Sequence, residues 1–243
     1  TPSIGSPTAQ QMLQWVAAAP LKAALALLAV LVAARTGVFI HSIRAYREKT
    51  KADRCLAPRT FLSLPAGSAP VRRLEFFKIN DEVMGGRSTS SVTAKGGDVT
   101  FSGVINTNGG GFASFRTLGA RSAGSDDEAP LGLPAECATV EVAATGDGRR
   151  YKVTLHVADS WAMSLPVWGA DFVTRGGRQT FRLPLRSFVP TRQGRVVKAP
   201  PLSPAAVTGV GFSLSLYTAD GKPNKEFGDG PFELTVHGVE IKR

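Results

Sequence analysis

The segment Val210-Gly211-Phe212-Ser213-Leu214-Ser215-Leu216 decides the fold class, because large apolar and small side chains alternate strictly along it. Successive side chains of a strand point to opposite faces, so this period of two predicts a strand with one buried face. Similar alternation recurs in residues 151–157 and 232–236. The sequence therefore predicts sheets whose inner faces form an apolar core.

Turn signals separate these segments at short intervals, for example Gly96-Gly97-Asp98, Gly146-Asp147-Gly148 and Asp220-Gly221. No helical stripe of comparable length follows residue 60. Many short strands joined by Gly-containing turns indicate an all-β fold, either a β-sandwich or a barrel.

Two glycine-containing runs stand out as candidate loops: residues 80–88, Asn-Asp-Glu-Val-Met-Gly-Gly-Arg-Ser, and residues 109–116, Gly-Gly-Gly-Phe-Ala-Ser-Phe-Arg. Paired glycines mark backbone that turns sharply or approaches another group closely. In the first run we expect Asn80 and Asp81 to cap or turn the backbone through local side-chain bonds. Contact with a partner is the second reading. The residues assigned to either role are Asn80, Asp81, Met84, Gly85, Gly86, Gly109, Gly110 and Gly111.

The run Gly109-Gly110-Gly111 is a weak candidate for a phosphate cradle. A phosphate loop needs a following helix, whereas residues 112–116 alternate like a strand. Asp81 and Glu82 are not expected to share a substrate, because adjacent strand residues face opposite ways. Three arginines are candidates for recognising a carboxylate or for pairing internally with Asp81 or Asp147. They are Arg116, Arg149 and Arg150.

Five sequence blocks resemble the complex I intermediate-associated protein 30 family. They are residues 80–88, residues 109–116, Gly146-Asp147-Gly148-Arg149-Arg150-Tyr151, Leu183-Pro184-Leu185-Arg186-Ser187-Phe188-Val189-Pro190, and Gly230-Pro231-Phe232-Glu233-Leu234. They occur in the family's order over roughly residues 72–243. Two departures are Phe77, where members often carry tryptophan, and residues 121–136, which read as a lengthened loop.

This resemblance implies a galactose-binding-like β-sandwich of the jelly-roll type over residues 72–243. It also implies a role in assembling membrane electron-transfer complexes, notably NADH:ubiquinone oxidoreductase. Members are not known as enzymes through this domain. Protein subunits of a membrane complex are therefore the expected partners.

The N-terminal residues 1–48 have a different composition, since Ala, Leu and Val dominate from Met12 to Ile43. A helix over about residues 20–44 would span a bilayer if the flanking Lys22 and Arg35 extend toward the headgroups. Two other readings are a signal-peptide apolar region and an amphipathic helix docked in a protein groove. The favoured reading is a retained membrane span.

Basic residues follow this apolar segment, beginning with Arg44 and Arg47. Residues 1–59 hold eight Lys/Arg and two Asp/Glu, out of a formal net charge of +10 for the whole chain. Basic flanks favour the non-translocated side, which predicts a mitochondrial inner membrane with a matrix-facing domain, or a thylakoid membrane with a stroma-facing domain. Residues 49–71 are expected to form a basic, proline-containing linker.

Several other functions are not expected. Lys/Arg residues are scattered through the domain without the dense basic face typical of nucleic-acid binding. His41, His156 and His237 lack nearby ligand partners in sequence, so no metal or other cofactor is predicted. No serine-nucleophile motif is present. Sugar stacking on Tyr151, Trp161 or Trp168 is a less favoured reading than protein contact.

The predicted function is thus a membrane-anchored, non-catalytic protein-binding module, either an assembly factor or an accessory subunit of an organellar electron-transfer complex. Alternatives are a carbohydrate- or small-ligand-binding sandwich, a photosynthetic assembly protein, and an enzyme with an unrecognised site. Cys55 and Cys137 are read as two ordinary thiols or, less favoured, as a single bridge.

Overall fold

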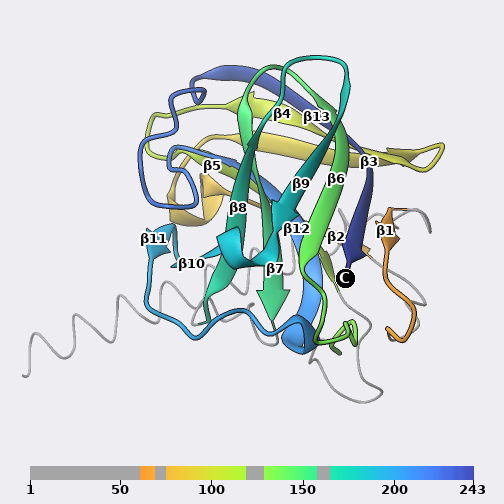
Figure 1. Cartoon of the computed structure of the whole chain (residues 1–243). Coiled ribbons are helices and arrows are strands. Elements are labelled where there is room, and N and C mark those ends of the chain that lie inside the picture. Colours follow the sequence, from red (N-terminus) through yellow and green to blue (C-terminus); the bar gives the residue numbers. More distant parts are fainter. Residues whose placement is uncertain (1–60, 69–74, 119–128, 158–164) are drawn as a thin grey trace, which may run out of the picture. The chain divides into compact units, whose positions relative to one another are not determined.

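A computed structural model describes residues 61–68, 75–118, 129–157 and 165–243 (Figure 1). All of them belong to one unit of the chain, Thr50–Arg243. The predicted helix over residues 20–44 lies outside these residues, as do its flanking Lys22, Arg35, Arg44 and Arg47. Within the described ranges, no helix has the length and apolar character needed to cross a membrane.

The first of two sheets contains six strands in the order β3-β4-β13-β6-β9, with the short β1 also paired to β13. Every pairing is antiparallel except that of β1 with β13. The bounds are β1 Leu62–Ser63, β3 Thr89–Lys95, β4 Asp98–Ile105, β6 Thr139–Gly146, β9 Arg178–Pro184 and β13 Gly230–Lys242.

The second sheet contains seven antiparallel strands in the order β11-β10-β8-β7-β12-β5-β2. Its strands are β2 Glu75–Asn80, β5 Phe112–Leu118, β7 Arg150–Val157, β8 Val167–Val173, β10 Val189–Arg192, β11 Arg195–Val196 and β12 Val207–Ser215. Among the described residues, three short 3-10 helices lie between strands: η1 Asp81–Met84, η3 Leu185–Ser187 and η4 Pro204–Ala206. The prediction of an all-β sandwich is confirmed.

The core lies between the two sheets and follows the predicted alternation. On β12, Val210, Phe212 and Leu214 are fully buried. Aromatic rings fill the centre, since Phe212 stacks on Phe115 with centroids 5.4 Å apart. The alternation ends sooner than the sequence suggested, because β12 stops at Ser215 and Leu216 is 40% exposed.

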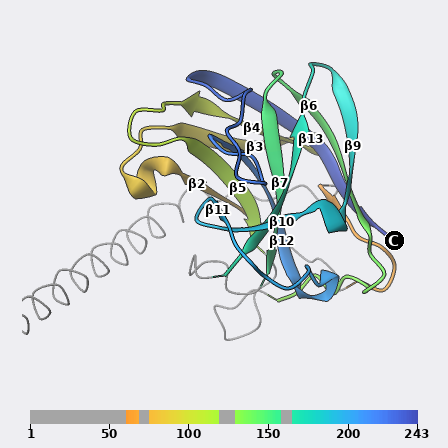
Figure 2. The ribbon, with the colours of Figure 1, turned by 60° about the vertical axis from the view of Figure 1, so that its left-hand side comes forward.

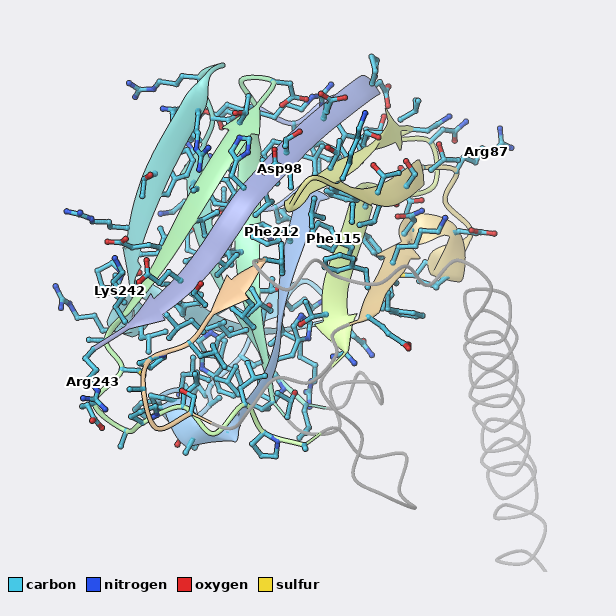
Figure 3. All side chains as sticks on the ribbon, turned by 90° about the vertical axis from the view of Figure 1, so that its right-hand side faces the viewer. Arg87, Asp98, Phe115, Phe212, Lys242 and Arg243 are labelled. Carbon is cyan, nitrogen blue, oxygen red and sulfur yellow. The ribbon has the colours of Figure 1, made fainter. Side chains whose placement is uncertain are left out.

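The sandwich begins before residue 72. Phe61 is completely buried and meets Phe76 edge to face, with ring centroids 5.1 Å apart. Leu62 pairs with Val239 near the end of β13, and Figure 3 shows the short β1 arrow beside that strand. Phe61 and Leu62, which the sequence assigned to the linker, are therefore core residues. Cys137 carries a free, buried thiol, and Cys55 lies outside the described residues.

Candidate partner-binding loops

Asp81 is the centre of the candidate site. It is fully buried at the start of η1, directly after the edge strand β2. Its Oδ1 accepts the backbone N–H of Ser88 at 2.9 Å, while its Oδ2 accepts the Ser88 hydroxyl at 2.6 Å and the Gly111 N–H at 2.8 Å. One carboxylate thus joins residues 81–88 to residues 106–111. We call these two segments the clamp loops.

Glycine is required where the clamp loops approach this carboxylate. A Cβ on Gly86 or on Gly110 would lie 2.7 Å from the Cβ of Asp81 and closer still to its carboxylate. Gly85 ends η1 with φ +88°, a left-handed conformation that disfavours any other side chain. The glycine runs therefore mark close packing around a buried acid, and the segment after Gly111 is strand β5, as expected.

Asn80 does not cap η1 with its side chain, contrary to the expectation of a local bond. Its Oδ1 instead accepts the Ser90 hydroxyl at 2.7 Å, linking β2 to β3. Asp81 does hold the turn at Gly85 and Gly86, because its backbone carbonyl accepts their N–H groups and its carboxylate accepts two bonds from Ser88 just beyond them. Its carboxylate reaches further along the chain. Glu82 is exposed while Asp81 is buried, so the two carboxylates do not face a common site.

The clamp loops present apolar surface to solvent. Met84 is 63% exposed at the end of η1. Leu216, 40% exposed, donates its N–H to the Gly111 carbonyl at 2.9 Å. A Cβ on Gly109 would lie 3.4 Å from the Gly85 carbonyl oxygen, so the two loops touch. Met84 and Leu216 therefore border one continuous stretch of surface formed by the clamp loops. Figure 3 shows Arg87, in the first loop, at the edge of the molecule away from β9.

Arg116 is buried, being only 4% exposed. Its guanidinium Nη1 lies 3.1 Å from Nδ1 of His156 on β7, across the intervening strand β12. A guanidinium can only donate, so Nδ1 of His156 accepts this hydrogen bond. Nε2 therefore carries the ring hydrogen and donates it to the Thr154 hydroxyl at 3.0 Å. Burial, and then the Arg116 charge, hold the pKa of His156 well below its usual range. Arg116 is thus embedded in the sheet.

Arg149 and Asp147 brace the loop before β13. They form an ion pair at 3.4 Å, and Arg149 also donates to the carbonyls of Gly228 and Pro231 at 2.7 and 3.1 Å. The other oxygen of Asp147 accepts the Tyr151 hydroxyl at 2.9 Å. Burial, and then the Asp147 charge, raise the pKa of Tyr151. The Gly-Asp-Gly-Arg-Arg-Tyr block is therefore a structural corner.

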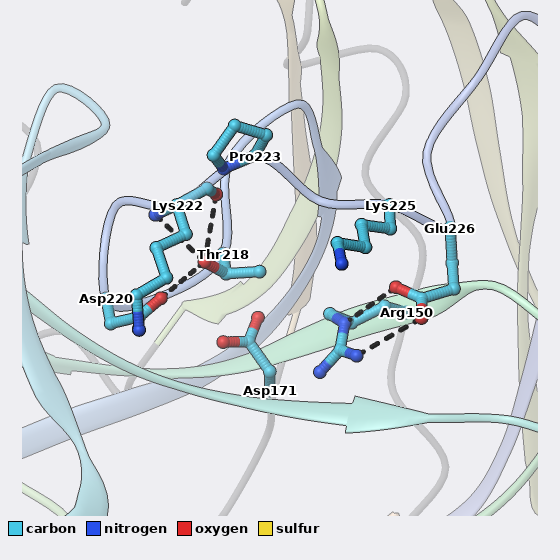
Figure 4. A pocket seen from close by; sticks show the side chains of 8 residues that line it. All are labelled: Arg150, Asp171, Thr218, Asp220, Lys222, Pro223, Lys225 and Glu226. Atoms are coloured by element: carbon cyan, nitrogen blue, oxygen red, sulfur yellow. Dashed lines mark hydrogen bonds and ion pairs between the residues drawn. The ribbon is translucent and has the colours of Figure 1, made fainter.

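Arg150 faces a shallow pocket of about 360 Å³ (Figure 4). Its guanidinium donates to both oxygens of Glu226, at 2.9 and 3.2 Å. Asp171 accepts the Ala219 N–H at 2.7 Å, and burial raises the pKa of its carboxyl. Three basic and three acidic side chains line this pocket, and no aromatic ring does. Its charges largely compensate one another, so we do not assign it a ligand.

Two of the three aromatics considered for sugar stacking belong to the core. Tyr151 is fully buried and Trp168 is 8% exposed. Trp161 lies outside the described residues. His237 has polar neighbours that its sequence context did not reveal, since Asp98 and Thr145 lie 3.1 and 2.9 Å from its ring nitrogens. Over the part of the chain that the structure describes, no group of three metal-ligating side chains is present.

Comparison with known families decides the identity. The sequence profile of the family named "Complex I intermediate-associated protein 30" matches residues 69–236. The chain belongs to this family. Its profile includes both clamp loops, but it leaves out Phe61 and the end of β13, which the structure shows to be part of the sandwich.

Other comparisons add little. No curated protein matches the chain. Similar solved structures include a family 11 carbohydrate-binding module from Clostridium thermocellum in complex with a β-1,3-1,4-mixed-linked tetrasaccharide, with 12% identity, a TM-score of 0.40, and coverage of 72% of this chain and 95% of that one. A family 29 carbohydrate-binding module shows 10% identity and a TM-score of 0.33, covering 76% and 88% of the two chains. Such distant similarities carry no argument about this family member's ligand.

Proposed function

We propose that this protein is a membrane-anchored, non-catalytic module that binds protein subunits, acting as an assembly factor or accessory subunit of a respiratory complex I-like electron-transfer complex. Family membership supports an assembly-related role. The observation that carries the proposal is the Asp81 clamp. It holds two loops in one arrangement and leaves Met84 63% exposed.

A rigid loop surface favours protein binding, because less conformational entropy is lost when a partner docks. Buried bonds from Asp81 fix the backbone of both clamp loops before any partner arrives. Met84 and Leu216 supply apolar contact at the border of this surface, and methionine adapts well to an irregular partner. Side-chain anchors on a preformed backbone are typical of binding surfaces.

A non-catalytic role is supported by what the conspicuous polar residues do. Asp81 holds the clamp loops, Asp147 and Arg149 hold the corner before β13, and Arg150 is paired with Glu226. Each of these charges therefore has an evident structural partner. A catalytic group instead needs access to substrate and a proton to give or take.

Membrane anchoring is the part of the proposal that rests on sequence. The apolar residues 23–34, flanked by Lys22 and Arg35 and followed by basic residues, support one span with the sandwich on the non-translocated side. The mitochondrial inner membrane with a matrix-facing domain is the favoured location, and the stromal face of a thylakoid is the alternative. A tether raises the effective concentration of the domain near its partner.

Native extraction tests this function. The full chain is solubilised from its membranes in mild detergent, separated on a native gel, and analysed by mass spectrometry. We expect it to migrate in a high-mass species together with subunits of an electron-transfer complex. Migration as a free monomer with no co-purifying subunits would overturn the proposal.

A further inference from the structure

The chain has a long stretch with cations and no acids. Between Asp171 and Asp220 there are seven Lys/Arg and not a single Asp or Glu. All seven side chains are exposed. They are Arg175, Arg178, Arg182, Arg186, Arg192, Arg195 and Lys198. We call this set the cationic strip.

The fold brings the cationic strip to one side of the sandwich. Arg178 and Arg182 are exposed positions of β9, the edge strand of the six-stranded sheet. Arg192 and Arg195 belong to β10 and β11, at one edge of the seven-stranded sheet. Short connections lead from β8 to β9 and, through η3, from β9 to β10 (Figure 2). The β9 edge of one sheet and the β10–β11 edge of the other therefore border the same side of the sandwich.

Most of this charge is not compensated. Arg182 pairs with Glu141 at 2.8 Å, although the arginine side chain remains 78% exposed. For the other six cations, the described residues provide no ion pair. Elsewhere on the sandwich, basic side chains such as Arg150 and Lys222 do have acidic partners. The cationic strip is therefore set apart by its composition, and most of its charge has no counterion among the described residues.

An exposed apolar side chain accompanies these charges. Val196 is 48% exposed in the β10–β11 hairpin and follows Arg195 directly. Gln193 and Gly194 form the turn of this hairpin, both with positive φ. Arginines around one exposed aliphatic group suit an interface in which phosphates are bound and a small apolar group enters the headgroup boundary.

We propose that the cationic strip docks on the anionic lipid headgroups of the membrane to which the chain is anchored. This inference rests on the proposed membrane anchor. Lipid is favoured over an acidic protein because the cations are spread over a strand, a turn and a hairpin rather than converging on one pocket. Anionic surfaces attract such distributed cations, and each one near the surface adds about a fivefold increase in binding.

Such docking would orient the sandwich. The first clamp loop connects β2 to β3, which lie at the edges opposite β11 and β9 in their respective sheets. The second clamp loop connects β4 to β5, the strands that pair with β3 and β2. With the cationic strip on the bilayer, the clamp loops occupy the opposite edges, where protein subunits reach them. The two surfaces thus have separate tasks.

The test uses the full chain with vesicles of phosphatidylcholine alone or with added phosphatidylglycerol. Hydrogen exchange is measured in residues 175–198 for the natural protein and for a triple variant, Arg178→Gln, Arg192→Gln and Arg195→Gln. The matched control is Lys95→Gln, Lys222→Gln and Lys225→Gln, which removes the same charge elsewhere. We expect slower exchange on anionic vesicles only, reversed by high salt, absent in the triple variant and retained in the control.

Equal exchange on neutral and anionic vesicles would overturn the inference. So would protection that arises only when a protein partner is added, because the occupant would then be a protein. Flotation of the chain with neutral vesicles tests the membrane anchor separately from the cationic strip. If the chain does not float with them, the anchor is wrong. Salt-sensitive flotation with anionic vesicles that the triple variant loses, on the order of 100-fold in binding, would still support the cationic strip.

Discussion

The Asp81 carboxylate accepts the backbone N–H of Gly111 at 2.8 Å, across thirty residues of sequence. The same carboxylate binds the N–H and hydroxyl of Ser88. These three bonds connect the two glycine runs that mark the family, and they explain why both runs occur in one chain. Burial of this carboxylate is tolerated because it accepts hydrogen bonds from donors that would otherwise have no acceptor at the end of the sandwich.

Replacing Asp81 by Asn tests this clamp. The amide keeps one acceptor oxygen but places an NH2 group against either Ser88 or Gly111, leaving a buried donor unsatisfied. We expect a loss of about 2–3 kcal/mol in the free energy of unfolding. Urea denaturation followed by circular dichroism measures it. Glu233→Gln, which removes an exposed carboxylate, is the control and should change stability by less than about 0.5 kcal/mol. Equal losses in both variants would refute a special role for Asp81.

Alanine at the clamp glycines should also destabilise the fold. At Gly86 or Gly110 the new methyl group collides with Asp81, which cannot move without breaking its own bonds. Each variant should lose about 1–3 kcal/mol, as overpacked sites do. Gly228→Ala is the matched control, because a Cβ there meets no atom within 4 Å and its φ is not positive. If all three variants had the stability of the natural chain, the close packing around Asp81 would be wrong.

Phe61 should contribute strongly to stability although it precedes the family match. Its ring is fully buried between Phe76 and Phe212. Phe61→Ala is expected to cost about 3–5 kcal/mol, typical for removing a buried aromatic side chain. Ser63→Ala, at an exposed position two residues later, is the control. A shift in thermal midpoint no larger for Phe61→Ala than for the control would show that the sandwich does not need this segment.

The lowered pKa of buried His156 predicts that the folded protein loses stability in mild acid. Its folded pKa is depressed, so the neutral ring is retained in the native state while the unfolded chain binds a proton below about pH 6.5. Unfolding therefore becomes easier as pH falls below that value, by up to about 1.4 kcal/mol per pH unit from this group. His156→Gln should have a flatter stability profile between pH 7 and pH 5 in urea titrations. Identical profiles for the two proteins would contradict a neutral, buried His156.

Much of the fold follows from local patterns in the sequence. The alternation around Phe212 and Leu214 predicted a core strand, and the glycine-containing turns predicted short strands, because both patterns act over a few residues. Phe61 was not recognised as core. It follows a proline-containing segment with no alternation, and its burial depends on pairing with β13, almost two hundred residues away along the chain.

The candidate site was less predictable, because its contacts also join residues that are far apart in the sequence. The glycine runs showed that something approaches the backbone closely, but nothing local showed that Asp81 is the group approached by both. Arg116 and His156 meet across β12, where Gly211 has no side chain to separate them. The alternation of small and large residues on β12 was visible in the sequence, yet which polar groups would use the space beside the small residues depended on the order of strands.

One comparison tests the central claim most directly: recovery of partner subunits with the full chain carrying Met84→Asp, against the natural chain. Thr93→Asp, which adds the same charge at an exposed position of β3, is the control. Desolvating a charge at position 84 of the clamp-loop surface should weaken partner binding by at least about tenfold, with the unfolding free energy unchanged. Full recovery of the subunits with Met84→Asp would contradict the assignment of the clamp loops as the binding surface.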